Sequence, residues 1–188
     1  MTTIVGLCGS LRAASYNRML MRLAEGVMPS SMKLQALEWR EVPVFDADVL
    51  ARGMPPLVSS LREQVRRADG ILIVTPEYNF SIPGGLKNLI DWLSRGEDQP
   101  FAGKPAAILS ASPGPVGGAR VQYDLRKVLL FVNAMTLVKP EVFVGNVASK
   151  FNAEGECIDE TTRKFVTAQM AAFEAWIAAV KRMVAPAA

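Results

Sequence analysis

Side chains that can donate hydrogen bonds are clustered just after the first apolar run of the chain, TIVGLC at 3–8. They are Ser10, Arg12, Ser15 and Asn17, within the segment GSLRAASYNR at 9–18. A helix is predicted to begin near Ser15, and the first N–H groups of a helix lack intrahelical partners and carry the positive end of its dipole. A phosphate monoester is dianionic and has three terminal oxygens that accept hydrogen bonds. The segment is therefore predicted to bind a phosphate group at a helix N-terminus.

Two better-known phosphate-binding patterns do not match this segment. The dinucleotide pattern GxGxxG fails because the glycines here are Gly6 and Gly9, and Walker A fails because no GK[ST] follows. A purely structural interpretation remains open, in which Ser15 only caps the helix and Arg12 is solvated. The cluster of donors directly after a buried strand favours phosphate binding.

A second loop, TPEYNFSIPGGLKN at 75–88, combines aromatic, amide and carboxylate side chains between prolines. Its backbone can bind the edge of a flat heterocycle, and Tyr78 is placed to cover an aromatic face. The alternative is a structural turn with Tyr78 and Phe80 in the core.

A third loop, SASPGPVGGAR at 110–120, offers the hydroxyls of Ser110 and Ser112 beside several glycines. A flat ring can pack against such a loop, because glycines have no side chains. Ligands of open parallel sheets lie beyond the carboxyl ends of the strands. The three loops together predict a site for a phosphate-bearing planar ring, most naturally FMN.

The order of apolar segments indicates how these loops are positioned. Strands are predicted at 3–8, 34–39, 70–75, 106–111 and 134–140, and helices at 17–27, 55–68, 83–95, 117–132 and 159–183. Some of the strands are almost continuously apolar, as in parallel sheets that are covered on both faces. The alternation predicts a single α/β domain over 1–188 with helices on both faces of an open parallel sheet. The segment 42–56, rich in Pro and Gly, is predicted to be a surface loop.

The composition excludes several kinds of chemistry. The chain has 188 residues, no histidine, and two isolated cysteines, Cys8 and Cys157. Ser-His-Asp catalysis, His-ligated metals and cysteine-based zinc or iron–sulfur sites are therefore excluded. Cys8 is predicted to be a small buried residue and Cys157 a loop or hairpin residue. No metal site is predicted, because Asp46 and Asp48 have no further carboxylate at a ligating spacing.

Charge and hydropathy bear on location and partners. The net charge is +3, without long blocks of one sign, so neither nucleic acid nor a membrane surface is expected as a partner. No apolar run approaches the roughly 20 residues that span a bilayer. No signal peptide is recognised at the N-terminus, and a cytoplasmic location is expected.

The segments GSLRAASYNR, PEYNFSIPGGLKNLIDW and SPGPVGGAR together resemble the NADPH-dependent FMN reductase family, over about residues 3–180. The nearest resemblance is to its bacterial quinone, chromate and azo-dye reductase branch. The resemblance implies a flavodoxin-like three-layer sandwich with a five-stranded parallel sheet of order 2-1-3-4-5. It further implies bound FMN, NADPH or NADH as co-substrate, small-molecule electron acceptors, and a homodimer or homotetramer.

The resemblance also implies roles for individual residues. The phosphate of FMN is assigned to Ser10, Arg12, Ser15 and Asn17. The isoalloxazine ring is assigned to Pro76, Glu77, Tyr78, Asn79 and Phe80 on one side, and to Ser110, Gly114 and Gly117 from the other loop. Candidates for subunit contacts are Asp91, Trp92 and Arg95, together with Arg120, Tyr123 and Glu141.

Such an enzyme needs no histidine, because hydride passes from nicotinamide C4 to flavin N5 and the cofactor carries the chemistry. No catalytic side chain is predicted. Nicotinamide and acceptor use the same face in turn, so ping-pong transfer to quinones, azo dyes, chromate or free flavin is expected. Two other functions remain open: a flavodoxin-like electron carrier, which the basic charge disfavours, and a flavin-free scaffold.

Overall fold

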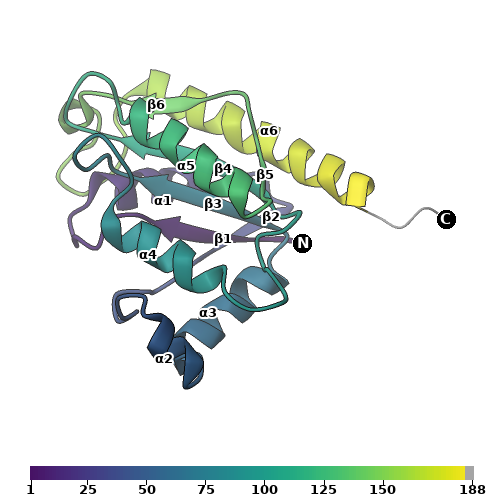
Figure 1. The fold of residues 1–188 in the computed structure, drawn as a ribbon. Helices are drawn as coiled ribbons and strands as arrows, with labels where there is room; N and C mark the ends of the chain where they lie inside the picture. The colour runs from purple at the N-terminus through teal and green to yellow at the C-terminus, as the bar shows by residue number, and fades with distance from the viewer. Residues whose placement is uncertain (185–188) are drawn as a thin grey trace.

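A parallel sheet forms the middle layer of the computed structural model, which describes residues 1–184 (Figure 1). Its strands are β1 (Thr2–Cys8), β2 (Met32–Ala36), β3 (Gly70–Thr75), β4 (Pro105–Ala111), β5 (Met135–Thr136) and β6 (Val142–Val144). The strand order is β2-β1-β3-β4-β5, with β6 also paired to β4, so the predicted order is confirmed. The predicted domain extends to residue 188, and its last four residues, 185–188, lie outside the described part.

Helices cover both faces of the sheet (Figure 1). They are α1 (Tyr16–Gly26), α2 (Ala47–Ala51), α3 (Pro56–Arg67), α4 (Gly84–Leu93), α5 (Ala119–Phe131) and α6 (Glu160–Val184), with a short 3-10 turn, η1 (Val147–Ser149). Apolar residues of α1 and α6 pack together in one core cluster, and those of α3, α4 and α5 in another. The three-layer sandwich expected from the sequence is therefore confirmed.

The central strands β3 and β4 explain why the core has two halves. Every residue of both strands is buried. Successive side chains of a strand point to opposite faces, and accordingly Leu72 and Val74 join the α1–α6 cluster, whereas Ile71 and Ile73 join the other. This arrangement fixes the carboxyl ends of the central strands, from which the predicted loops emerge.

The fifth strand differs from its prediction at 134–140. It is divided into β5 and β6, which pair with β4 through Thr136 opposite Ala106 and Val142 opposite Leu109. The chain between them leaves the ladder around Pro140, which has no N–H to donate. Residues 42–56 also differ, because they contain α2, whose N-cap Asp46 accepts a hydrogen bond from the N–H of Asp48 at 2.8 Å.

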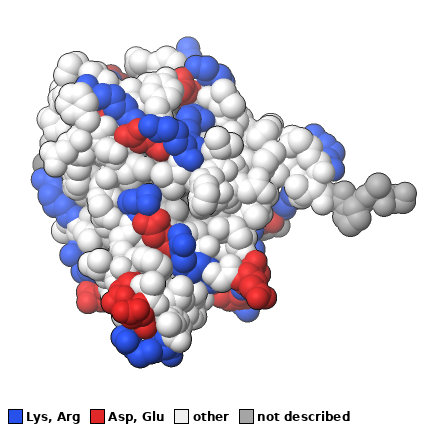
Figure 2. All heavy atoms as spheres, viewed as in Figure 1, with Lys and Arg blue, Asp and Glu red and all other residues white. Residues whose placement is uncertain are grey.

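The surface carries mixed charge. On the face shown in Figure 2, basic and acidic side chains are interspersed, so this face has no continuous basic area of the kind that binds nucleic acid. Within residues 1–184, no helix has the length and hydropathy needed to cross a bilayer. The same described residues contain no group of three or more His, Cys, Asp or Glu side chains placed to hold a metal ion.

A buried arginine organises the loop that follows α4. Arg62, on α3, is 6% exposed. Its guanidinium donates to the carbonyl oxygens of Leu93 at 2.7 Å and Asp98 at 3.0 Å, and also to that of Arg95. It also pairs with the Asp98 carboxylate at 3.2 Å. One side chain thus satisfies several carbonyl groups that would otherwise lack a donor.

Replacing Arg62 with methionine is expected to lower the free energy of unfolding by about 3 kcal/mol, because several charge-assisted hydrogen bonds are lost together. Urea unfolding measures the loss. Arg66→Met is the matched control, because Arg66 pairs with Asp98 and Glu63 from a half-exposed position, where an ion pair contributes about 1 kcal/mol or less. Equal losses in the two variants would show that the buried position of Arg62 has no special role.

Candidate active site

Three loops follow neighbouring strands and meet at one edge of the sheet. Residues 9–15 follow β1, residues 76–83 follow β3, and residues 112–118 follow β4. β1 pairs with β3 and β3 with β4, in each case in parallel, so the three carboxyl ends are adjacent. Strand order reverses between β1 and β3, and such a switch point is where open α/β sheets bind ligands. The loops singled out by their composition are therefore brought together.

The first turn offers backbone donors beside a cation. Ser15 is the N-cap of α1, and its Oγ accepts a hydrogen bond from the N–H of Asn17 at 3.2 Å. Ser10 is also buried, and its Oγ lies 3.4 Å from the N–H of Arg12. The N–H groups of residues 13–16 donate to no acceptor within residues 1–184. These free donors at a helix N-terminus fit a phosphate dianion.

Arg12 adds positive charge to this turn. It is exposed, and its guanidinium carbon lies 5.9 Å from the centroid of the Tyr16 ring. The guanidinium forms no salt bridge in the described part of the chain. Its donors are therefore available to an anionic ligand.

Asn17 has a more internal position than its predicted role suggests. Its side chain is 3% exposed. Its Nδ2 donates to the carbonyl oxygen of Ala111 at 3.0 Å, and its Oδ1 accepts from the N–H of Ala111 at 3.0 Å. Asn17 thus joins α1 to the end of β4, and these two hydrogen bonds use only one of its two Nδ2 protons.

The second loop forms a tight turn with exposed aromatics. The N–H of Tyr78 donates to the carbonyl of Ser81 at 3.1 Å, and the reverse bond is 3.0 Å long. Between them, Asn79 and Phe80 have φ values of 49° and 69°, as both central residues of a type I′ turn require. Tyr78 is 51% and Phe80 67% exposed, so the alternative that places them in the core is wrong.

The carboxylate of Glu77 joins the second loop to α5. Its Oε1 accepts from Arg120 Nε at 2.7 Å and its Oε2 from the N–H of Val121 at 3.2 Å. The Arg120 guanidinium also lies over the Phe80 ring, 3.8 Å from the centroid. Glu77, predicted to line a ring, therefore also holds the loop and α5 together.

A second link runs from Ser81 to Asp124, also on α5. The Ser81 hydroxyl donates to Asp124 Oδ2 at 2.8 Å. Hydrogen bonds from Lys127 and Ser81 lower the pKa of the Asp124 carboxyl below its ordinary value. Asp124 therefore keeps its charge, and its hydrogen bond with Ser81, to a lower pH than an ordinary aspartate would.

The third loop is held from inside by Ser110. Ser110 is fully buried, and its hydroxyl lies 2.7 Å from the carbonyl oxygen of Gly117. The N–H of Gly114 donates to Ser112 Oγ at 3.1 Å. Gly117 has a φ of 64°, and a Cβ there would lie 2.7 Å from the N atom of Gly145. Among the residues predicted to contact the ring from this loop, Ser110 holds the loop in place through its hydroxyl. Gly114 and Gly117 contribute only backbone atoms.

Gln122 was missed by sequence reasoning. It is fully buried on α5, and its Nε2 donates to Ser110 Oγ at 2.8 Å. The available signal was its position: Gln122 precedes Leu125 and Leu129 at helical spacing, so a polar residue lies on the apolar face of α5. A polar side chain at such a position needs a partner.

Trp92 is not available for subunit contacts, so its predicted interface role is wrong. It is fully buried, its Nε1 donates to the carbonyl of Pro43 at 2.9 Å, and its ring packs edge-on against Phe45. Asp91, on α4, and Arg95, just after its end, are partly exposed. The tryptophan lies on the apolar stripe of the helix and fills the core.

Two other predicted contact positions lie on α5 and directly before β6. Tyr123 is 52% exposed and its ring lies 6.3 Å from that of Phe143. Glu141 pairs with Lys139 at 2.6 Å, and this hydrogen bond lowers the pKa of the Glu141 carboxyl. These side chains remain candidates for contact with a second subunit.

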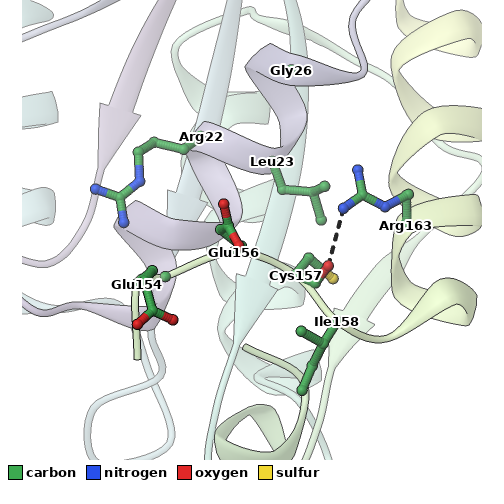
Figure 3. A pocket seen from close by; sticks show the side chains of 9 residues that line it. Arg22, Leu23, Gly26, Glu154, Glu156, Cys157, Ile158 and Arg163 are labelled. Atoms are coloured by element: carbon green, nitrogen blue, oxygen red, sulfur yellow. Dashed lines mark hydrogen bonds between the residues drawn. The ribbon is translucent and has the colours of Figure 1, made fainter. Parts of the chain in front are cut away.

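Both cysteines lie where the sequence predicts. Cys8 is buried in β1, and burial raises the pKa of its thiol. Cys157 pairs with Phe151 in an isolated bridge. It lines a cavity of about 500 Å³ between α1 and the start of α6, where Arg163 donates to the Cys157 carbonyl at 3.0 Å (Figure 3). None of the predicted site residues lines this cavity.

The strand order and the position of the three loops define a flavodoxin-like α/β protein. Residues 2–149 match the family described as NADPH-dependent FMN reductase. The chain therefore belongs to the NADPH-dependent FMN reductase family. It is an oxidoreductase that uses FMN with NAD(P)H as electron donor, so the predicted family, enzyme class and cofactors are confirmed.

Individual relatives can be aligned with nearly the whole chain. A quinone reductase from Escherichia coli is 49% identical over 95% of this chain and 96% of its own length. An NAD(P)H-dependent FMN reductase from Pseudomonas aeruginosa is 44% identical over 93% and 94%. The solved structure of FerB, a flavoenzyme NAD(P)H:(acceptor) oxidoreductase from Paracoccus denitrificans, superposes with a TM-score of 0.88 at 34% identity, covering 95% of this chain and 98% of FerB.

Proposed function

We propose that this chain transfers hydride from NADPH or NADH to FMN bound over the three loops, and passes the electrons on to quinones. The first turn carries this proposal, because its free N–H groups at residues 13–16 lie beside the exposed Arg12. The quinone reductase named among the relatives supports the choice of acceptor. Azo dyes, chromate and free flavin are further acceptors, and the enzyme acts in the cytoplasm as a homodimer or homotetramer of single-domain subunits.

In this proposal Ser10, Arg12 and Ser15 bind the phosphate together with the backbone of the turn. Bound FMN supplies the hydride acceptor and returns electrons to the second substrate. The Asn79 and Phe80 N–H groups, which have no acceptor within residues 1–184, bind the ring edge and hold the negative charge that reduction places there. The exposed Tyr78 and Phe80 rings shield one side of the site from water.

The proposed order of substrates rests on one shared site for nicotinamide and acceptor. Glu77 joins the second loop to the start of α5, directly after the third loop, so the two loops lie on the same side of the site. Nicotinamide and acceptor then occupy the same place in turn. Initial rates measured at several NADPH and quinone concentrations are expected to give parallel double-reciprocal lines, as in ping-pong kinetics. Intersecting lines would show that both substrates bind together and would contradict this order.

The absorption spectrum of the purified protein tests the central proposal. We expect a yellow protein that bleaches under nitrogen on addition of NADPH or NADH, and that recovers its colour when a quinone is added. Bleaching without a protein partner separates a reductase from an electron carrier. A protein that ignores added FMN, or that keeps its colour with both nucleotides, would contradict the proposed function.

A further inference from the structure

Gln122 connects α5, β4 and β6 beside the third loop. From α5, its Nε2 donates to Ser110 Oγ at 2.8 Å and to the carbonyl oxygen of Val142 at 2.8 Å. Ser110 lies near the end of β4 and Val142 begins β6. Both Nε2 protons are therefore used, one on β4 and one on the first residue of β6.

Ser110 connects Gln122 to the third loop. With Gln122 donating to its oxygen, the Ser110 hydroxyl proton is directed to the carbonyl oxygens of Gly117 at 2.7 Å and Gly118 at 3.2 Å. In a trans peptide the C=O and the following N–H point in opposite directions. The N–H of Gly118 is thereby directed away from Ser110, and it has no acceptor within residues 1–184.

The Gln122 side chain at this buried position carries an energetic cost. Its Oε1 is buried and has no hydrogen-bond partner in the described part of the chain. An unpartnered buried acceptor is destabilising, whereas an apolar side chain of similar shape at this position would avoid the cost. What an apolar side chain cannot do is orient the hydroxyl of Ser110.

We propose that Gln122 is a positioning residue of the FMN site: through Ser110 it fixes the peptide between Gly117 and Gly118, so that the loop presents its N–H groups to the ring. The inference rests on the proposed function and assigns a role to a side chain that does not itself reach the ligand. Loss of the Gln122 carboxamide leaves Ser110 free to rotate, and the loop then samples other peptide orientations.

The chain offers a matched control in Gln169. This glutamine of α6 is 2% exposed, and its Nε2 donates to the carbonyl oxygens of Ile108 at 3.1 Å and Pro140 at 2.8 Å. Its Oε1 is also buried without a partner in residues 1–184. Gln169 therefore links β4 to the segment between β5 and β6, but it forms no hydrogen bond with Ser110 or with residues 112–118.

The test compares Gln122→Met and Gln169→Met with the wild-type protein, each freed of flavin and titrated with FMN. We expect Gln122→Met to weaken FMN binding about 10-fold, the effect of losing one good hydrogen-bonding arrangement, and to shift the visible absorption bands of bound FMN. Gln169→Met is expected to bind FMN with wild-type affinity and spectrum. The two variants are expected to have similar Tm values, since each loses two hydrogen bonds donated by a buried carboxamide.

Ser110→Ala gives a second measurement that does not depend on the folding of Gln122→Met. It is expected to reproduce the loss of affinity, and the double variant is expected to lose no more, because both changes break one network. Wild-type affinity and spectrum in Gln122→Met, or equal loss in Gln169→Met, would overturn the positioning role while leaving the proposed function intact. A wild-type chain that binds no FMN would overturn both.

Discussion

Arg12→Ala is expected to weaken FMN binding by about 1.5–3 kcal/mol, the usual contribution of a hydrogen bond to a charged group. The fold should be unaffected, because the Arg12 side chain is exposed and forms no salt bridge within residues 1–184. Fluorescence titration of the flavin-free protein with FMN measures the loss. Riboflavin, which has the ring without the phosphate, should bind both proteins equally.

Arg22→Ala is the matched control for the loss of one positive charge. Arg22 is exposed on α1, as Arg12 is exposed just before this helix, but it lines the separate cavity beside Glu154 and Cys157. FMN affinity should stay at the wild-type value in this variant. An unchanged affinity in Arg12→Ala, or the same loss for riboflavin as for FMN, would remove Arg12 from the phosphate site.

Gly117→Ala is expected to destabilise the protein by about 3 kcal/mol and to reduce FMN affinity. The left-handed conformation costs a non-glycine residue about 1–2 kcal/mol, and close packing adds a further penalty. At Gly117 the φ is 64°, and a Cβ would lie 2.7 Å from both Gly145 N and the carbonyl carbon of Phe143. Backbone atoms cannot rotate away, so the third loop must shift.

The same loop supplies the control for this variant. At Gly114 an added Cβ meets only Ser112 Oγ, at 3.6 Å, which is an ordinary contact. Gly114→Ala should therefore keep the wild-type Tm, and any effect on FMN then reports the space beside the ring. Thermal unfolding and FMN titration of the two variants check this pair, and equal Tm values would contradict the account of Gly117.

The sheet could be predicted because each central strand can be recognised from its own short stretch of sequence. GILIVT and AAILSA are short apolar runs that fit strands buried on both faces, and the structure places β3 and β4 there. The three loops were recognisable because polar and glycine-rich segments directly follow those runs. Parallel strands then bring the loops to one edge without any further information.

The division of the fifth strand could not be predicted from the run AMTLVKP. Its apolar character fits a strand, but the pairing ends after Thr136 and resumes at Val142. The side chain that covers the gap from the α6 face, Gln169, is distant in the sequence. Local patterns carry no information on such a contact.

The site residues illustrate the same limit. Ser10, Ser15 and Arg12 follow from a local motif, whereas the contacts of Asn17 and Glu77 depend on partners in other elements, Ala111 and Val121. Trp92 was misassigned because helical spacing does not distinguish the face that enters the core from the face that meets a second subunit. Burial in the folded chain decides between them.

The divided strand also bears on how the protein avoids aggregation. A chain that extends a sheet needs a continuous row of unpaired N–H and C=O groups along an edge strand. β5 offers only Met135–Thr136 and β6 only Val142–Val144, and Pro140 between them has no N–H to offer. Strand addition by a misfolded neighbour is therefore confined to the opposite border of the sheet, at β2.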